Sequence, residues 1–414
     1  MAQTVANLSA VLKDAWTSDR IQKQFYNKNP ILDKIGSVAG TMIGQQAQVP
    51  IHSGRNGGYT STLPAGGALN PAGQQEVDQA LYTMVYHWFQ IALETAALAQ
   101  SGSNSQSIIA AKDLEMKGAI DDMSKQCSRQ LVGNGDGVLA VLAGNASSAT
   151  IPLLTTGYGR SSLVRGHIHA GQTVDIGAVG TPGSTVQGAK IIAVDKQVVA
   201  PSITLDAPVV VAANAVLTIA NPNGTTVANP ELNGFRNIAG SNASLGGINP
   251  ATAGFDWWAP ALVDNTTTTL TLDGPLNLQQ AVFEQTGEFA TSVFTSPKQA
   301  REFYSLLQNQ VRFAGEMGMG AGNVGGLVGL SWNGQGINVV PDIADRDWYN
   351  LTLADFVRVT GGITTPTWTS ELEGSGGDVR WSPGTTSFVE GLVWPFQIGV
   401  QRRNTHAAMT NLTV

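Results

Sequence analysis

The chain has 414 residues, of which 42% are hydrophobic and only 13% are charged, with a formal net charge of -7. Typical soluble domains carry about 25% charged residues, so much of this surface can be buried without the cost of desolvating charges. The 9 Trp, 12 Phe and 7 Tyr residues, together with the small net charge, exclude a disordered chain.

Composition also disfavours several functional classes. The mild acidity argues against a dedicated nucleic-acid-binding domain, for which the pI is usually above about 9. The single cysteine, Cys127, excludes an internal disulfide framework. No apolar run reaches the roughly 18 residues of a membrane span, and the N-terminus lacks the features of a secretory signal. We therefore expect about two or three domains, no membrane association and a reducing cytoplasm.

Residues 1–44 are predicted to form an arm rather than a folded unit. Thr17 or Ser18 can cap a short helix, which Asn29-Pro30 ends. The segment has too few apolar residues to fold alone, so it needs a surface to lie on. Ordinary packing within one subunit is the alternative for its aromatic residues. We expect four side chains to contact a neighbouring molecule: Trp16, Arg20, Phe25 and Tyr26.

Residues 45–92 are predicted to form a long β-hairpin. Ala47, Val49 and Ile51 alternate as in a strand, and the run from Val77 to Ile91 is rich in aromatic and β-branched residues. The stretch 53–76 between them lacks periodicity, and such long structureless loops are uncommon inside compact domains. It is either an arm that reaches another molecule or a surface loop. In the first case its anchors on a neighbour are Arg55, Tyr59 and Leu63.

A long helix is predicted over Ser105 to Leu131, within a domain at 93–154. Apolar residues recur there at helical spacing: Ile109, Met116, Ile120, Met123, Cys127 and Leu131. Cys127 is therefore expected to be a buried structural thiol. The stretch from Asn134 to Gly137 resembles part of a calcium loop, but the bidentate Glu is missing, so we interpret it as a turn.

Residues 155–230 are predicted to form an inserted all-β module, a small barrel or sandwich. Short strand-like runs recur there at spacings near ten, beginning with SLVRGHIH at 162–169. His167 and His169 lie two apart on one face of that expected strand. Two histidines without a third ligand do not make a zinc site, so we predict an exposed strand face instead.

The remaining chain, 231–414, is predicted to be mixed and then β-rich. An amphipathic stretch surrounds Leu278, Val282 and Phe283, and Ser296-Pro297 is a good helix start. One face of that helix is expected to carry the following residues: Ala300, Phe303, Leu307 and Val311. A GxGxxG pattern at 320–325 is followed by a strand-like run rather than a helix, which disfavours a dinucleotide site.

No active-site signature is present. The sequence has neither a GxSxG elbow nor a GxxxxGK[ST] phosphate loop, and its few His, Asp and Glu residues do not cluster. We therefore predict that the protein is not an enzyme and has no catalytic, cofactor-binding or metal-binding residues. An enzyme of an unrecognised type is left as a distant alternative.

The order of these segments resembles the major capsid proteins of tailed double-stranded DNA bacteriophages, which have the Hong Kong 97 phage coat fold. The arm contains WTSDRIQKQFYNKNPILDKI, an extended loop follows from Gln45 to Val85, and the long helix ends in LVGNGDGVLA. TSPKQAREFYSLLQNQV resembles part of the axial domain, and VQRRNTHAAMTNLTV resembles the closing strand of the peripheral domain. The resemblance covers the whole chain.

This resemblance implies an α+β, Hong Kong 97-like fold with six parts. They are an N-terminal arm (1–44), an extended loop or E-loop (45–92), a peripheral domain with a spine helix (93–154), an inserted β-barrel or sandwich (155–230), an axial domain (231–345), and peripheral strands with the C-terminus (346–414).

It also implies self-assembly into hexamers and pentamers of an icosahedral head around double-stranded DNA. That DNA would be enclosed without specific binding. The implied partners are a portal protein, a separate scaffolding protein and, in some relatives, decoration proteins. The protein would be assembled in the bacterial cytoplasm and reside in the virion.

Two departures from some relatives are informative. No lysine occurs between Lys34 and Lys112, so cross-linking through a lysine of the extended loop is predicted to be absent. The arm begins almost at once, which predicts no cleaved scaffolding segment. Two other functions stay open: the shell of an encapsulin-like bacterial nanocompartment and, more distantly, a secreted β-rich surface-layer or adhesin protein.

Overall fold

The structure is a computed structural model that combines helices with extensive sheet. It describes residues 31, 35, 37–38, 42–43, 46–59, 71, 73–94, 105–155, 160–197, 199–224, 231–264, 268–311, 331–332, 334–360, 363, 366–369, 380–381 and 387–413. Within these ranges there are four sheets, three of six strands and one of three strands. The α+β class is therefore confirmed, whereas the six domain limits remain predictions.

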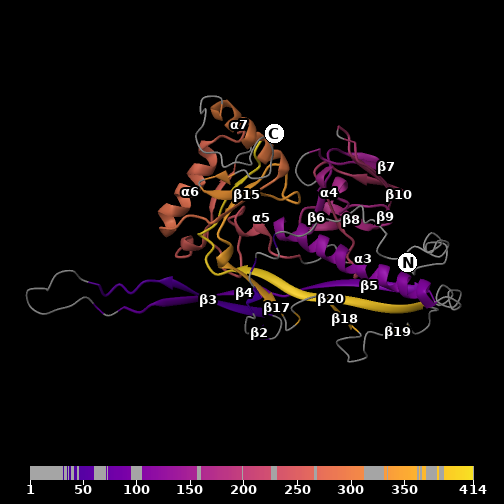
Figure 1. Ribbon diagram of the computed structural model, residues 1–414, viewed down its shortest axis with the longest axis horizontal. Coiled ribbons are helices and arrows are strands. Elements are labelled where there is room, and N and C mark those ends of the chain that lie inside the picture. The colour runs from indigo at the N-terminus through magenta and orange to yellow at the C-terminus, as the bar shows by residue number, and fades with distance from the viewer. Residues whose placement is uncertain are drawn as a thin grey trace, which may run out of the picture.

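The first sheet lies along helix α3 (Ser105–Val132) and is organised around one long strand (Figure 1). That strand, β20 (Ser387–Val400), pairs from Ser387 to Phe396 with β5 (Val85–Glu94). Its other edge carries shorter strands: β17 (Phe356–Thr360), β18 (Thr367–Trp368) and β19 (Arg380–Trp381). Strand β1 (Ser37–Val38) pairs with β17.

Helix α3 confirms the predicted helix to within one residue at its C-terminal end. Met123, Cys127 and Leu131 are buried, as the apolar stripe predicts. Ile120 contradicts the stripe, because it is 37% exposed and Ala119 makes the core contact at that turn instead. The side chain of Ile109 lies outside the described residues.

The second sheet carries two helices on one face. Its order is β12-β21-β16-β13-β15-β14. The strands are β12 (Ala261–Asp264), β13 (Ser292–Thr295), β14 (Ser331–Trp332), β15 (Gln335–Val339), β16 (Trp348–Leu351) and β21 (Ala407–Thr410). Helices α6 (Asp273–Thr286) and α7 (Pro297–Val311) share an apolar core with this sheet. Its other face joins the core of the first sheet through α5 (Phe235–Ile238), whose Phe235 ring contacts Phe294, Tyr349 and Phe356.

The two predicted helices of this region are present. The Ser296 hydroxyl accepts the backbone N–H of Gln299 at 3.2 Å, which confirms Ser296 as the cap of α7. On α7, Ala300 and Phe303 are buried as predicted and Leu307 is half-buried, while the side chain of Val311 lies outside the described residues.

On α6 the predicted apolar face is only partly correct. Leu278 and Val282 are buried as expected. Phe283 is exposed instead, because it turns away from the sheet and stacks on Phe289 with ring centroids 4.6 Å apart.

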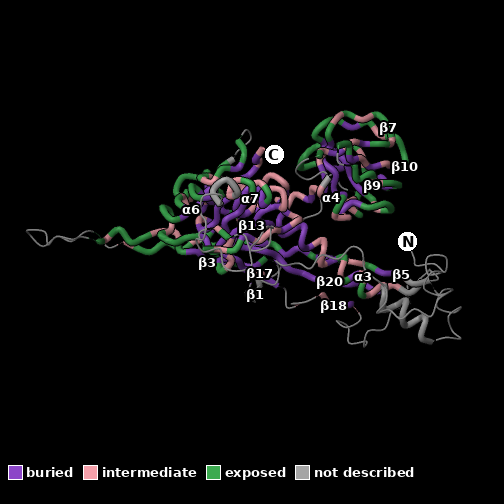
Figure 2. The backbone as a smooth tube through the Cα atoms, turned by 45° about the horizontal axis from the view of Figure 1, so that its top comes forward, coloured by how far each residue is buried: buried purple, intermediate pink, exposed green. Residues whose placement is uncertain are grey.

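The third sheet has its own apolar core and lies to one side of the body (Figures 1 and 2). Its order is β6-β11-β8-β9-β10-β7. The strands are β6 (Val138–Val141), β7 (Ala146–Pro152), β8 (Thr173–Ala178), β9 (Thr181–Asp195), β10 (Ser202–Val211) and β11 (Val216–Ile219). An antiparallel bridge between Leu142 and Leu153 links the ends of β6 and β7, the two outer strands. The first and the last strand of this order therefore lie next to each other at that point. We call residues 138–219 the inserted sheet.

One expectation for the inserted sheet is wrong, and the sheet includes more of the chain than the sequence predicts. The run at 162–169 is not a strand: helix α4 (Arg160–Arg165) occupies it and a turn follows. Ser162 favours this local fold, because its hydroxyl donates to the carbonyl of Leu139 at 2.6 Å. The sheet also begins before residue 155, because β6 and β7 belong to it.

A smaller sheet forms the predicted hairpin. Strand β3 (Gln46–Gly54) pairs with β4 (Glu76–Thr83) and with the short β2 (Met42–Ile43). The paired strands β3 and β4 project beyond the body, and most of their described residues there are exposed (Figures 1 and 2). The run 77–91 is two strands, because the chain leaves the hairpin at Met84 and continues as β5 in the first sheet.

The C-terminal segment departs from the sequence expectation. The resemblance to capsid proteins implies that its last strand closes the peripheral domain, the domain that contains the spine helix. Strand β21 instead pairs with β12 and β16 in the second sheet. Of the last two strands of the chain, β20 belongs to the sheet beneath α3 and β21 does not. Residues 401–406 therefore cross from one sheet to the other.

Candidate functional site

The predicted interface residues fall into two groups. Arg55 and Tyr59 are described, lie beyond the paired part of the hairpin and are exposed, with Tyr59 82% accessible. Close by, the Asn56 side-chain oxygen accepts the N–H of Gly58 at 2.8 Å and that of Gly73 at 3.1 Å, which ties the two sides of the hairpin together. The other predicted residues lie outside the described residues: Trp16, Arg20, Phe25, Tyr26 and Leu63.

The outward row of the hairpin has no acidic or basic side chain apart from one histidine. The alternating burial of β3 turns Ala47, Val49 and Ile51 inward. The outward pairs across β3 and β4 are Gln46–Thr83, Gln48–Leu81, Pro50–Gln79 and His52–Val77. All eight positions are exposed. Because desolvating such a row costs little, it can be buried against another surface.

The root of the hairpin is fixed to the body by Tyr82. This side chain is buried, and its hydroxyl donates to the carbonyl of Val400 at 3.0 Å and accepts its N–H at 3.1 Å. A side chain at position 399 would collide with the Tyr82 ring at 2.5 Å, so Gly399 allows this approach. The Leu81 N–H donates to the carbonyl of Gly246 at 2.9 Å. The base of the hairpin is therefore rigidly mounted while its outer part projects.

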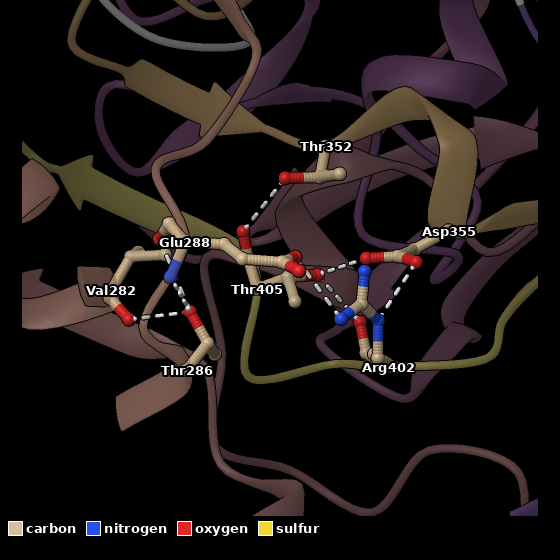
Figure 3. Close-up of polar contacts among 7 residues, drawn as sticks. All are labelled: Val282, Thr286, Glu288, Thr352, Asp355, Arg402 and Thr405. Atoms are coloured by element: carbon tan, nitrogen blue, oxygen red, sulfur yellow. Dashed lines mark hydrogen bonds and ion pairs between the residues drawn. The ribbon is translucent and has the colours of Figure 1, made fainter. Parts of the chain in front are cut away.

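A polar junction joins the two sheets of the body where the chain crosses between them (Figure 3). Asp355 accepts the Nε–H of Arg402 at 3.0 Å and the hydroxyl of Thr405 at 2.6 Å. Arg402 also reaches Glu288 at 3.2 Å, and Thr352 donates to the carbonyl of Thr405 at 3.3 Å. The bond from Asp355 raises the pKa of Arg402. The junction is a structural clamp between the end of α6 and the crossing.

Arg403 and His406, which also lie in the segment that crosses between the sheets, are fully buried. Arg403 donates to four carbonyls, those of Asn237, Ile238, Ser241 and Ala243. Burial lowers its pKa to about 10, so it remains charged at neutral pH. Burial also lowers the pKa of His406 to about 3, and its neutral ring accepts the N–H of Thr352 at 3.2 Å. Both groups fix the crossing rather than face a ligand.

A groove of about 1010 Å³ separates the inserted sheet from α3 and β5. The β5 side contributes Tyr86 and Trp88, which are both largely exposed, at 60% and 59%. The inserted sheet contributes Ile219 and Lys196 to the opposite wall. Sequence reasoning missed this groove, although the alternation of VYHWFQI does turn Tyr86 and Trp88 to one side of the strand.

The residues considered in the sequence for metal binding or nucleophilic catalysis lie in the core, against a buried carboxylate or in turns and loops. Cys127 is buried as predicted, and burial raises the pKa of its thiol, which stays protonated. The predicted strand is absent at both histidines: His167 is buried against Asp342 at 2.9 Å, and His169 is exposed as predicted but lies outside any strand. The oxygens of Asp136 accept the Val138 N–H and an Asn134 amide proton, which confirms the turn.

Two searches over the described residues bear on other functions. In the ranges given above, no group of three or more His, Cys, Asp or Glu side chains is placed to hold a metal ion. No helix there combines the length and apolar character needed to cross a membrane. The GxGxxG pattern at 320–325 lies outside the described residues.

Comparison with solved structures identifies the fold. A chain of the cyanophage A-1(L) capsid asymmetric unit is similar over 96% of both chains, with a TM-score of 0.57 and 12% sequence identity. The chain has the fold of a phage capsid subunit. The resemblance drawn from the order of sequence segments is thus confirmed at the level of the fold, and the α+β architecture described above is Hong Kong 97-like.

Other solved structures match less closely. The capsid of the native GTA particle is 10% identical with a TM-score of 0.48 and full coverage of both chains. The holo-SrpI encapsulin complex from Synechococcus elongatus PCC 7942 is 8% identical with a TM-score of 0.44, covering 100% of this chain and 96% of that one. No protein-family profile and no curated protein sequence matches the chain.

Proposed function

We propose that this chain is the major capsid protein of a tailed bacteriophage. It would assemble as hexamers and pentamers into an icosahedral head that encloses double-stranded DNA. The observation that carries the proposal is the capsid fold shared over 96% of the chain with the cyanophage A-1(L) subunit. The low charge content of 13% supports it, because a shell subunit buries large surfaces against several neighbours.

The hairpin is proposed to overlap a neighbouring subunit. Its uncharged outward row and its projection from a rigid root support this role. Arg55, Tyr59 and Leu63 would anchor it on the neighbour. The N-terminal arm would make a second contact through its own predicted residues: Trp16, Arg20, Phe25 and Tyr26.

The inserted sheet is proposed to be an insertion domain of the shell subunit. It has a separate apolar core and leaves the body between α3 and α5, so the body can keep its fold around it. Its order of strands, which returns on itself, supports the small barrel expected from the sequence.

The remaining partners follow from this role. A separate scaffolding protein would guide assembly in the bacterial cytoplasm, a portal protein would occupy one vertex, and decoration proteins could bind the outer surface. The DNA would be enclosed without specific binding, in keeping with the net charge of -7. Contacts between subunits would be non-covalent, because no lysine lies between Lys34 and Lys112. The final location would be the virion.

The test is assembly of full-length variants, measured by sedimentation and electron microscopy. The double variant Arg55→Ala with Tyr59→Ala alters two exposed side chains, so the subunit should fold normally but form few or no shells. Val210→Ala is the matched control, since it removes an exposed apolar side chain from the inserted sheet and should assemble normally. Deletion of residues 1–28 should likewise leave soluble protein without shells. Normal shells from the double variant and the deletion would refute these interface assignments.

The content of the particles separates the proposal from its nearest alternative. Particles from infected cells should protect double-stranded DNA of genome length from nuclease. Particles that hold only protein cargo would favour an encapsulin-like compartment, and flat lattices would favour a surface-layer protein.

A further inference from the structure

Asp342 connects the inserted sheet to the body at a buried point. It lies in the segment between β15 and β16, next to the core residue Ile343. Its carboxylate accepts the hydroxyl of Ser128 on α3 at 2.9 Å and binds His167 Nε2 at 2.9 Å. It also forms an ion pair with Arg165 at the end of α4. Three chain segments that are far apart in the sequence therefore meet at one carboxylate.

These groups are shielded from water. The accessible fractions of the side chains are 6% for Asp342, 12% for Arg165 and 2% for His167. Burial alone would raise the pKa of Asp342, but the bonds and charges of His167 and Arg165 lower it to about 2. The carboxylate is thus ionised at neutral pH and is the counterion of a nearly buried guanidinium. Removing a partner of such a pair leaves an uncompensated buried charge.

The covalent attachment of the inserted sheet lies elsewhere, at a narrow crossing. The chain enters after α3 at Gly133 and returns at Gly234, and the two backbones touch. A side chain on Gly234 would lie 2.6 Å from the Gly133 nitrogen and closer still to the carbonyl oxygens of Gly133 and Gln130. The buried pair of Arg129 with Glu231 closes the same crossing. Two chain segments that touch at one point hold the inserted sheet in place there. They leave its rotation about the Gly133–Gly234 crossing weakly constrained.

We propose that Asp342 is a latch that sets the orientation of the inserted sheet. With Arg165 and His167 held, the sheet cannot turn about the Gly133–Gly234 crossing, and the groove beside α3 keeps its width. Without the latch the sheet pivots and the groove varies in width, while the cores of the body and of the inserted sheet stay intact. The proposal concerns the single subunit and does not depend on its role in a shell.

The test measures a distance across the groove in the full-length chain. Spin labels are placed at Lys117→Cys on α3 and Lys190→Cys on β9, both exposed positions, and labelled chains are diluted with unlabelled ones. Cys127 is buried with a protonated thiol and should not react, which the chain without introduced cysteines checks. The unmodified latch should give one narrow distance distribution, and Asp342→Ala and Asp342→Asn should each broaden it.

Asp347→Asn is the control for loss of stability. Asp347 is also a buried carboxylate paired with an arginine, Arg236, but it contacts only the body, so its variant should keep the narrow distribution. If Asp342→Ala does not fold, Arg165→Met removes the latch from the inserted side and should broaden the distribution as well. A narrow, unshifted distribution in the folded latch variants, or equal broadening in the control, would overturn the proposal.

Discussion

The bond between Tyr82 and Val400 supports a quantitative prediction about the root of the hairpin. Tyr82→Phe keeps the ring that packs over Gly399 and removes only the hydroxyl. Both the N–H and the carbonyl of Val400 then lose their partner on the hairpin. Because the site is buried, water cannot replace the hydroxyl without opening the packing around the ring.

The expected loss can be worked from these two bonds. An intramolecular hydrogen bond contributes about 0.5–1.5 kcal/mol net, and leaving a buried group without a partner costs about 1–3 kcal/mol. Two bonds at 3.0 and 3.1 Å therefore predict a fall of about 1–3 kcal/mol in the free energy of unfolding. If it is expressed locally, this corresponds to about 5- to 150-fold faster hydrogen exchange.

Two measurements on dissociated subunits check the prediction. Urea denaturation should show a lower midpoint with an unchanged slope, and the amide of Val400 should exchange faster than in the unmodified protein. Tyr59→Phe is the matched control, because Tyr59 is largely exposed and its variant should change stability by less than about 0.5 kcal/mol. An unchanged midpoint together with unchanged exchange at Val400 would refute the reasoning.

Three further predictions concern the body and the shell. Gly234→Ala should destabilise the subunit by about 3 kcal/mol or more in urea denaturation, because its Cβ would overlap backbone atoms that cannot move aside; a change below about 0.5 kcal/mol would contradict this. The pKa of His406 is lowered to about 3, so the unfolded chain binds its proton first and stability falls as pH drops below about 6.5. The loss from this group should reach about 2 kcal/mol by pH 5, and His406→Gln should flatten the slope; identical slopes would count against it. Shells boiled in SDS should give a single monomer band, and a ladder would show covalent cross-links.

Local sequence patterns correctly predicted the elements that are specified by the spacing of neighbouring residues. The stripe through Met123, Cys127 and Leu131 and the cap at Ser296 placed two helices correctly, because helical spacing and capping are properties of neighbouring residues. The alternation through Val49 and Ile51 likewise placed the hairpin.

Long-range pairing could not be derived in the same way. Strand β21 has a pattern that fits either sheet, and only the register with β12 and β16 decides between them. The run 162–169 has strand-like composition, but its surroundings stabilise α4 through the bond from Ser162 to Leu139. Tertiary contacts therefore overrode local preference at both places.

The candidate sites also divide into features that local sequence patterns indicate and features that depend on long-range contacts. The exposure of Arg55 and Tyr59 could be predicted, because an aperiodic stretch marks a segment without a core of its own, whereas their contact with a neighbour stays a prediction. The latch was missed because Asp342 and His167 are 175 residues apart and neither stands in a motif. The sequence around His167 predicts an exposed residue, and nothing in its neighbours indicates the buried carboxylate that it contacts.

The proposed function requires that this chain builds a closed shell. Electron cryomicroscopy of particles assembled from the full-length protein, with its scaffolding partner where one is needed, tests it most directly. We expect icosahedral particles, tens of nanometres across, with hexamers and pentamers in which the hairpin of each subunit lies over its neighbour. Filaments, flat lattices or protein that stays monomeric at every concentration would contradict it.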